Sequence, residues 1–250
     1  MRIESLLRPL FSSRTYRGGT IVAVSLLLAA VTVVASPTIT VNLNPGDSIN
    51  LESLVANDTS VQVGDKLFSD FQFSSSNTGG SLADNLSTTA INVTALSNPF
   101  GFGISFSGPF ITTNGSITED VVLKYSVMVT DPHQLISDVH LGFNGTVVGT
   151  GVAKVTEQVM TNGFGMDTIA LLDVYNQGTP NPVFNDVALL LLPTEKLFIQ
   201  KDIIFGGGGS LSIIDQNFSQ VPEPSTLLLA GVGCAALVVL RRRKRTTMAS

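Results

Sequence analysis

The stretch Lys124-Tyr125-Ser126-Val127-Met128-Val129 alternates between polar and apolar residues over its first four positions. Successive side chains of a β-strand point to opposite sides, so Tyr125, Val127 and Val129 share one face of an extended chain. That face is apolar, whereas the opposite face begins with a lysine and a serine. The pattern predicts a strand from Val121 to Thr130 that buries one face in a core.

Segments of the same kind recur on both sides of this stretch. They are rich in Val, Ile, Thr and Phe and are separated by Gly, Asn, Asp, Ser and Pro, which is typical of strands and turns. The predicted strands are Thr38 to Leu43, Lys66 to Phe73, Thr89 to Ala95, Phe102 to Phe106, Val139 to Phe143, Val152 to Val159, Ile169 to Tyr175, Val187 to Leu192, Leu197 to Phe205 and Leu211 to Ile214.

Turn signals indicate how these strands are joined. The pairs Asn114-Gly115, Asn144-Gly145 and Asn162-Gly163 favour antiparallel hairpins, and the glycine run from Gly206 to Ser210 is interpreted as a flexible hairpin connection. No convincing helical spacing of apolar residues extends over eleven residues, and the nearest competitor, Ala153 to Met160, is predicted as a strand. The fold class is therefore all-β, an antiparallel β-sandwich with a strand count compatible with a jelly roll.

Charge is distributed unevenly along the 250 residues. Residues 36–220 contain five lysines and seventeen Asp and Glu, a net charge of −12, and no arginine. An acidic surface repels phosphate backbones, which argues against a nucleic-acid partner and favours neutral polymers or divalent cations. The only cysteine, Cys234, lies outside this body, so a packed core without disulfides must stabilise it.

The N-terminus has the three regions of a secretory signal peptide. Four arginines precede an apolar run from Ile21 to Val34, and small or β-branched residues lead to Ala35 and Ser36. Residues 1–35 are predicted to be a signal peptide that signal peptidase removes between Ala35 and Ser36 after the secretion machinery has engaged it. An uncleaved N-terminal anchor or a buried helix is the alternative.

The C-terminus combines a rigid peptide, an apolar segment and a basic end. Pro222-Glu223-Pro224 keeps the chain extended, because each proline fixes its own φ and disfavours helix in the preceding residue. Residues 225–240 follow as an apolar helix that is short for a stable membrane span. The basic stop, expected on the cytoplasmic side, consists of Arg241, Arg242, Arg243, Lys244 and Arg245.

These three parts, in this order, resemble the PEP-CTERM sorting signals of Gram-negative bacteria. The resemblance covers about 25 residues. It implies that residues 221–250 are a sorting tail, recognised by an exosortase, a membrane protease with a cysteine nucleophile. It also implies an exported protein that is first anchored in the inner membrane and then released to the cell surface or beyond, often alongside exopolysaccharide. A plain tail anchor would explain the helix and basic end but not Pro222-Glu223-Pro224.

The body, residues 36–220, also resembles domains that often precede such tails. The resemblance rests on Asp65 to Phe71, Lys124 to Val127, Val155 to Glu157 and Lys201 to Ile203. Those domains mostly lack an assigned activity. The resemblance therefore bears on the fold more than on the function.

Residues with catalytic chemistry are sparse in the body. Its two histidines, His133 and His140, are interpreted as a turn residue and an exposed strand residue, and neither has a cysteine nearby. Paired carboxylates for glycoside hydrolysis would come from Glu119, Asp120, Glu52, Glu157 and Glu195, most of which are expected to be solvated. We therefore expect no catalytic site, cofactor or metal, although loops such as Asn57-Asp58-Thr59 would allow calcium.

Two functions are favoured by these patterns, and a secreted hydrolase with carboxylates clustered in a cleft is a third class. The first is a non-enzymatic cell-surface or extracellular-matrix protein, sorted and processed through its tail. The alternative is a carbohydrate-binding module that acts on exopolysaccharide. The body has no Trp and only two Tyr, so few aromatic residues remain as stacking platforms, and this weakens the alternative.

Overall fold

The computed structural model describes residues 39–80, 85–112, 115–178 and 180–223, and within them the chain is almost entirely strand. The predicted all-β class is confirmed. The predicted signal helix, apolar tail helix and basic stop lie outside the described residues. Among the residues that are described, no helix has the length and apolar character needed to cross a bilayer.

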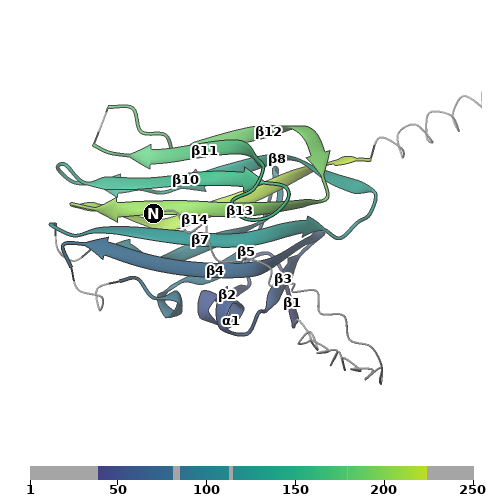
Figure 1. Cartoon of the computed structure of the whole chain (residues 1–250), viewed down its shortest axis with the longest axis horizontal. Helices are drawn as coiled ribbons and strands as arrows, with labels where there is room; N and C mark the ends of the chain where they lie inside the picture. The colour runs from purple at the N-terminus through teal and green to yellow at the C-terminus, as the bar shows by residue number, and fades with distance from the viewer. Residues whose placement is uncertain (1–38, 81–84, 113–114, 179, 224–250) are drawn as a thin grey trace, which may run out of the picture. The chain divides into compact units, whose positions relative to one another are not determined.

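Two sheets stack face to face in this part of the chain (Figure 1). Sheet A is antiparallel except at one edge, where β1 and β3 run parallel. Its strands are, in spatial order, β1 (Thr40–Leu43), β3 (Ser60–Val63), β4 (Lys66–Thr78), β7 (Thr118–Val129), β13 (Lys196–Gly206), β10 (Val152–Met160) and β11 (Thr168–Asn176).

Sheet B is antiparallel throughout its described strands. Its order is β12 (Asn185–Thr194), β8 (Gln134–Phe143), β14 (Gly209–Pro222), β6 (Gly101–Ile111), β5 (Asn92–Asn98) and β2 (Ser48–Asn50), with β9 (Thr146–Val147) pairing the start of β14. A one-and-a-half-turn helix, α1 (Leu51–Ala56), follows β2, and Asn50 caps it by accepting a hydrogen bond from the Glu52 N–H. A short 3-10 turn, η2 (Thr88–Ala90), precedes β5.

The core lies between the two sheets, and the alternating stretch of β7 is at its centre. Tyr125, Val127 and Val129 are all buried, as predicted. The Tyr125 ring lies 5.7 Å from that of Phe71 in sheet A and 5.6 Å from that of Phe106 in sheet B. Burying such large side chains supplies most of the driving force for folding. Residues 36–220 contain no cysteine, so no disulfide adds to the stability of the body.

Two of the predicted hairpin turns were wrong. The Gly206 to Ser210 run does not join neighbouring strands of one sheet, because β13 belongs to sheet A and β14 to sheet B. Gly207 and Gly208 have φ angles of +63° and +98°, so this short crossing between the sheets depends on glycine. Asn144-Gly145 is also no hairpin, since β9 pairs with β14 rather than with β8.

The Asn144 side chain has a different role, because its amide oxygen accepts hydrogen bonds from the Ser212 and Ile213 N–H groups. Asn162-Gly163 does lie in the connection of an antiparallel pair, β10 and β11. Asn114 lies outside the described residues.

Candidate functional site

A groove of about 670 Å³ opens on the outer face of sheet B. Its floor is formed by outward-facing positions of β8 and β14, notably His140, Gly142, Asp215 and Asn217. The lining continues with residues of β12 and with the turn between β5 and β6. This volume lies within the range of small-molecule sites in proteins.

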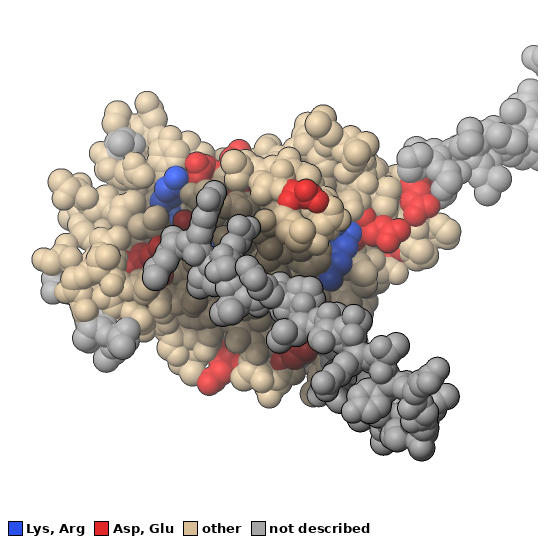
Figure 2. Space-filling model, in the orientation of Figure 1, with Lys and Arg blue, Asp and Glu red and all other residues tan. Residues whose placement is uncertain are grey.

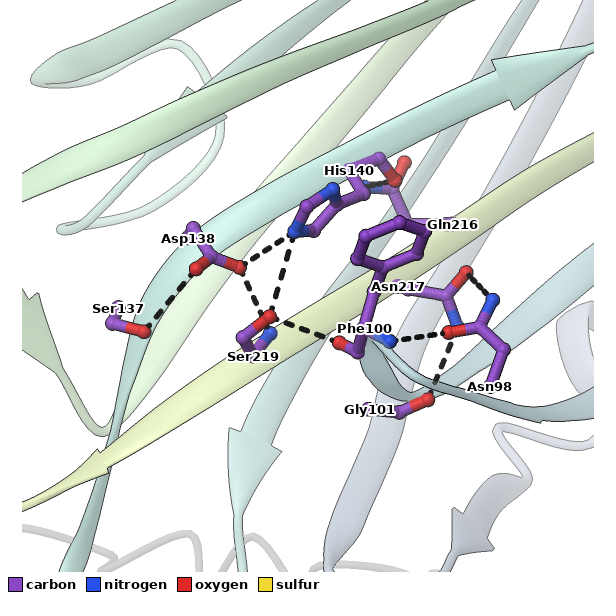
Figure 3. Close-up of polar contacts among 9 residues, drawn as sticks. All are labelled: Asn98, Phe100, Gly101, Ser137, Asp138, His140, Gln216, Asn217 and Ser219. Atoms are coloured by element: carbon purple, nitrogen blue, oxygen red, sulfur yellow. Dashed lines mark hydrogen bonds and ion pairs between the residues drawn. The ribbon is translucent and has the colours of Figure 1, made fainter.

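An aromatic side chain forms one side of this groove. Phe100 lies in the turn between β5 and β6 and is 51% exposed. Its ring stacks on the His140 ring, with centroids 4.4 Å apart and planes inclined by 26° (Figure 3). The stacked pair presents a flat apolar surface beside polar groups.

Hydrogen bonds hold the Phe100 turn from several sides (Figure 3). The Phe100 N–H donates to the Asn98 side-chain oxygen at 2.9 Å, and its carbonyl accepts from the Ser219 hydroxyl at 3.0 Å. Asn217 accepts from the Asn98 amide at 2.9 Å and donates to the Gly101 carbonyl at 3.3 Å. Because both backbone groups of Phe100 are bonded to side chains, its ring is held in place before any ligand arrives.

His140 is fixed by its neighbours on the same face. Its Nε2 lies 2.9 Å from Asp138 Oδ1 and 3.4 Å from Ser219 Oγ. In a Ser-His-Asp catalytic triad the hydroxyl and the carboxylate occupy opposite ring nitrogens. Here both face the same nitrogen, so this arrangement orients the ring and does not form a proton relay.

The polar character of the groove restricts the ligands that it could take. Amides from Asn98, Asn144, Asn185 and Asn217 line it together with the carboxylates of Asp186 and Asp215, and none of the described residues of the lining is a lysine or an arginine. Amides both donate and accept hydrogen bonds, which suits hydroxyl groups. Without a cation to pair with, an anionic ligand would be repelled.

The other residues considered for chemistry are scattered. His133 lies in the exposed turn before β8, where its N–H donates to Asp131 Oδ1 at 2.9 Å. Glu52 is on α1, Glu195 lies between β12 and β13, and Glu157 is buried in the core. Among the described residues, no three His, Cys, Asp or Glu side chains come together in a way that could hold a metal ion.

Part of the predicted sorting motif is attached to the domain. β14 continues to Pro222, which pairs with Gln134 of β8, and the Glu223 N–H donates to the His133 carbonyl at 2.9 Å. The motif thus begins at the end of a central strand. Pro224, the basic residues Arg241, Arg242, Arg243, Lys244 and Arg245, and the predicted cleavage site at Ala35 and Ser36 lie outside the described residues.

Sequence reasoning did not identify the groove. Asp138 precedes the predicted strand Val139 to Phe143, but both Asp138 and His140 belong to the longer β8, where a spacing of two residues places them on one face. Asn98 ends β5, Phe100 lies in the turn after it, and Asn185 begins β12; distant parts of the chain bring these residues to the groove. No sequence pattern indicates those contacts.

Residues 220–244 match the family model of the PEP-CTERM protein-sorting motif. This match confirms the resemblance of the C-terminus to that sorting signal. No curated protein matches the chain.

Some solved structures are similar to parts of the chain. A complex of the carbohydrate-binding module TmCBM61 with β-1,4-galactotriose is 13% identical, over 62% of this chain and 89% of the module, with a TM-score of 0.28. A galactose complex of the family 32 module of C. perfringens NanJ is 14% identical, over 58% of this chain and 93% of the module, at 0.22. An arabinose-bound α-L-arabinofuranosidase, MgGH51, is 15% identical, over 74% of this chain and 29% of the enzyme, at 0.29. TM-scores this low carry no argument about this chain.

Proposed function

We propose that this chain, which carries a PEP-CTERM sorting motif, is a non-enzymatic exported protein that an exosortase processes and that is displayed on the cell surface or in the extracellular matrix. The motif at residues 220–244 carries the proposal, and it indicates an exported precursor held in the membrane before processing. The predicted signal peptide supplies the route of export. The short apolar segment supplies temporary anchoring until the tail is cut.

The position of Glu223 offers a test of the sorting step. Replacing Glu223 by Ala in the producing bacterium should cause the unprocessed precursor to accumulate, because the acidic side chain between two prolines is the distinctive group of the motif. Intact mass and cell fractionation would measure the two forms. Glu195→Ala, which removes an exposed acid outside the motif, is the matched control and should be processed normally. Normal processing of Glu223→Ala, together with normal processing after deletion of residues 222–245, would contradict the proposal.

A second candidate function is binding of a neutral saccharide in the groove on sheet B. It is supported by the exposed Phe100 ring, held against His140 and surrounded by amides and carboxylates. A sugar ring has an apolar face that stacks on an aromatic ring and hydroxyl groups that hydrogen bond to amides. The expected ligand is a neutral exopolysaccharide of the producer, since the described lining residues include no lysine or arginine.

Removing the aromatic platform tests saccharide binding. Phe100→Ala should weaken binding of a neutral exopolysaccharide by about tenfold, corresponding to about 1.4 kcal/mol of lost stacking and burial. Calorimetry or retention on immobilised polysaccharide would measure the change. Phe198→Ala removes an aromatic side chain from the outer face of sheet A and should leave binding unchanged. Equal binding by both variants would rule out Phe100 as the platform.

A further inference from the structure

Three polar side chains meet in the middle of the core. Lys201 of β13, Glu157 of β10 and Gln216 of β14 each have no exposed surface. Lys201 Nζ donates to Glu157 Oε2 and to Gln216 Oε1, and Gln216 Nε2 donates to the His140 carbonyl at 3.0 Å. Lys201 and Glu157 are cross-strand partners in sheet A, whereas Gln216 belongs to sheet B. The cluster therefore bridges the two sheets.

This cluster is an unfavourable place for an ordinary ion pair. Removing two charges from water is costly, and the attraction between them compensates only when every remaining lone pair and proton has a partner. In the described part of the chain, Glu157 Oε1 and the nearby Tyr125 hydroxyl oxygen are buried without a hydrogen-bond partner. The ionic form of the pair thus leaves an unsatisfied carboxylate oxygen in the core.

Burial shifts the protonation of both members in the direction of the neutral pair. Desolvation raises the pKa of the Glu157 carboxyl, and this outweighs the opposing attraction of Lys201. Desolvation also lowers the pKa of the Lys201 ammonium group, against the opposing attraction of Glu157. Proton transfer from Lys201 to Glu157 gives a neutral amine and a carboxylic acid. A neutral amine is a nucleophile, and a buried carboxylic acid can donate a proton.

We propose that Lys201 and Gln216 react to form an intramolecular amide bond that covalently joins the two sheets, with Glu157 transferring the protons. The Lys201 Nζ is in contact with the side-chain carbonyl of Gln216, so the carbon bonded to that oxygen is an electrophile within reach. Holding amine and amide together in this way replaces an encounter in solution by a reaction within one site.

The step balances without any added reagent. The Lys201 Nζ lone pair forms a bond to Gln216 Cδ, and the carboxylic acid of Glu157 protonates the departing Gln216 Nε2. The Cδ–Nε2 bond breaks, one ammonia leaves, and the proton lost from Nζ returns to Glu157. No atom is oxidised or reduced. The reaction removes a buried positive charge and leaves Glu157 as a neutral acid beside an uncharged amide, which suits an apolar core.

Gln216 is a better acceptor than Glu157 itself. In an ion pair the Glu157 carboxylate repels an approaching nucleophile, and its conversion to an amide would expel an oxygen as water. The carboxamide of Gln216 is uncharged, and Glu157 is placed beside Lys201 to supply the proton that the leaving nitrogen needs. Complete burial excludes water, which would otherwise compete as a nucleophile and hydrolyse the product.

Intact mass spectrometry of the purified full-length chain tests the proposal. The chain should be lighter than its sequence by one ammonia. Fragmentation should place the loss in a looped peptide that trypsin no longer cuts at Lys201. Cleavage at Asp202 and Asp215 separates Lys201 from Gln216 along the backbone, so the two segments should stay joined through these side chains. Peptide mapping also separates this product from ammonia loss at Asn-Gly pairs such as Asn144-Gly145. A full-mass wild-type chain would overturn the proposal, and so would loss of one water with a link between Lys201 and Glu157.

Variants test the part that each side chain plays. Glu157→Gln and Gln216→Met should both have the full mass of their sequences, because the first lacks the proton carrier and the second lacks the electrophile. Gln200→Met, which changes a neighbouring glutamine on the outer face of β13, should keep the loss of ammonia. Persistence of the link in Glu157→Gln would overturn the role of Glu157. The wild-type mass decides the main question even if a core variant fails to fold.

Discussion

Asp202 lies on the outer face of β13 beside Asp120 of β7, and its carboxyl differs from the exposed acids of the domain. Burial, followed by the hydrogen bond and the negative charge of Asp120, raises its pKa from 3.8 to about 6. Between these two values the folded chain binds a proton that the unfolded chain has released. Asp202 therefore lowers stability as the pH rises through this range, and its full cost is present above about pH 6.

Replacing this carboxyl by an amide should stabilise the protein in a pH-dependent way. We expect Asp202→Asn to raise the free energy of unfolding near neutral pH by about 1 kcal/mol, the half-buried position allowing solvent to screen much of the effect. The gain should shrink toward about pH 4, where the wild-type carboxyl is protonated in the folded state. Urea unfolding at the two pH values measures the difference.

Glu195→Gln serves as the control for this comparison, since Glu195 is exposed and its replacement should change stability equally little at both pH values. An Asp202→Asn variant that is less stable than wild type near neutral pH would contradict the prediction. It would mean that the ionised carboxyl forms favourable contacts that outweigh its desolvation.

At the scale of single elements, β12 is unusual because it exposes leucines. Leu189, Leu191 and Leu192 are 79%, 100% and 81% exposed. The register with β8 is interrupted after Leu189 and resumes at Thr194, which marks an irregularity of the pairing in this part of the strand. The predicted strand Val187 to Leu192 is thus confirmed as a strand, but only Ala188 and Leu190 of its residues pack against the core.

The exposure of these leucines leads to a prediction on stability. The double substitution Leu191→Ser and Leu192→Ser should change the free energy of unfolding by less than about 0.5 kcal/mol, because neither side chain is removed from water by folding. It should also raise the protein concentration at which the chain begins to aggregate. Leu197→Ser, at a fully buried position of β13, is the contrasting variant and should cost about 3 kcal/mol or more. Chemical denaturation and light scattering measure the two properties.

Element prediction succeeded where a strand carries its own signal. The alternation around Tyr125 and the mainly apolar segment from Leu197 to Phe205 mark β7 and β13 almost to their ends. Three short strands, β2, β3 and β9, and α1 were missed, because two to six residues are too few for a periodic pattern and depend on neighbouring strands for support. β14 was predicted to end at Ile214, because the residues that follow it, Asp215 to Asn217, are polar. Their polarity is explained by tertiary contacts, such as the hydrogen bond between Gln216 and Lys201.

At the scale of the whole molecule, the assignment of strands to sheets could not be predicted. Asn-Gly and glycine-rich turns indicate where the chain reverses, but they do not distinguish a hairpin from a crossing between sheets. The run at Gly206 to Gly209 does the latter, and it places Lys201 and Gln216 opposite one another. The sequence indicates which residues of a strand face inward and which face outward. Which inward-facing residues of sheet A contact those of sheet B depends on how the sheets stack.

Figure 2, in the orientation of Figure 1 with sheet A toward the viewer, shows few charged side chains on a largely uncharged face. Some of the charged side chains of the domain are paired, as in the ion pairs Lys154–Asp173 and Lys196–Asp70. With five lysines against seventeen acids in the body, the acidic excess is spread over turns and strands and not gathered into a metal site in the described region. A negative, weakly patterned surface of this kind keeps the exported domain away from anionic polymers. The groove on sheet B, with its amides and the carboxylates of Asp186 and Asp215, is the most distinctive part of that surface.

The position of β14 has a mechanical consequence. This strand is central in sheet B, flanked by β8 and β6, and its last residues lead directly into the tail that is held in the membrane. A pull on the anchored end acts along the strand, so the hydrogen bonds on both of its sides are loaded in shear and must break together instead of unzipping singly. While the precursor is tethered, drag on the domain is therefore borne by one of its best-supported strands.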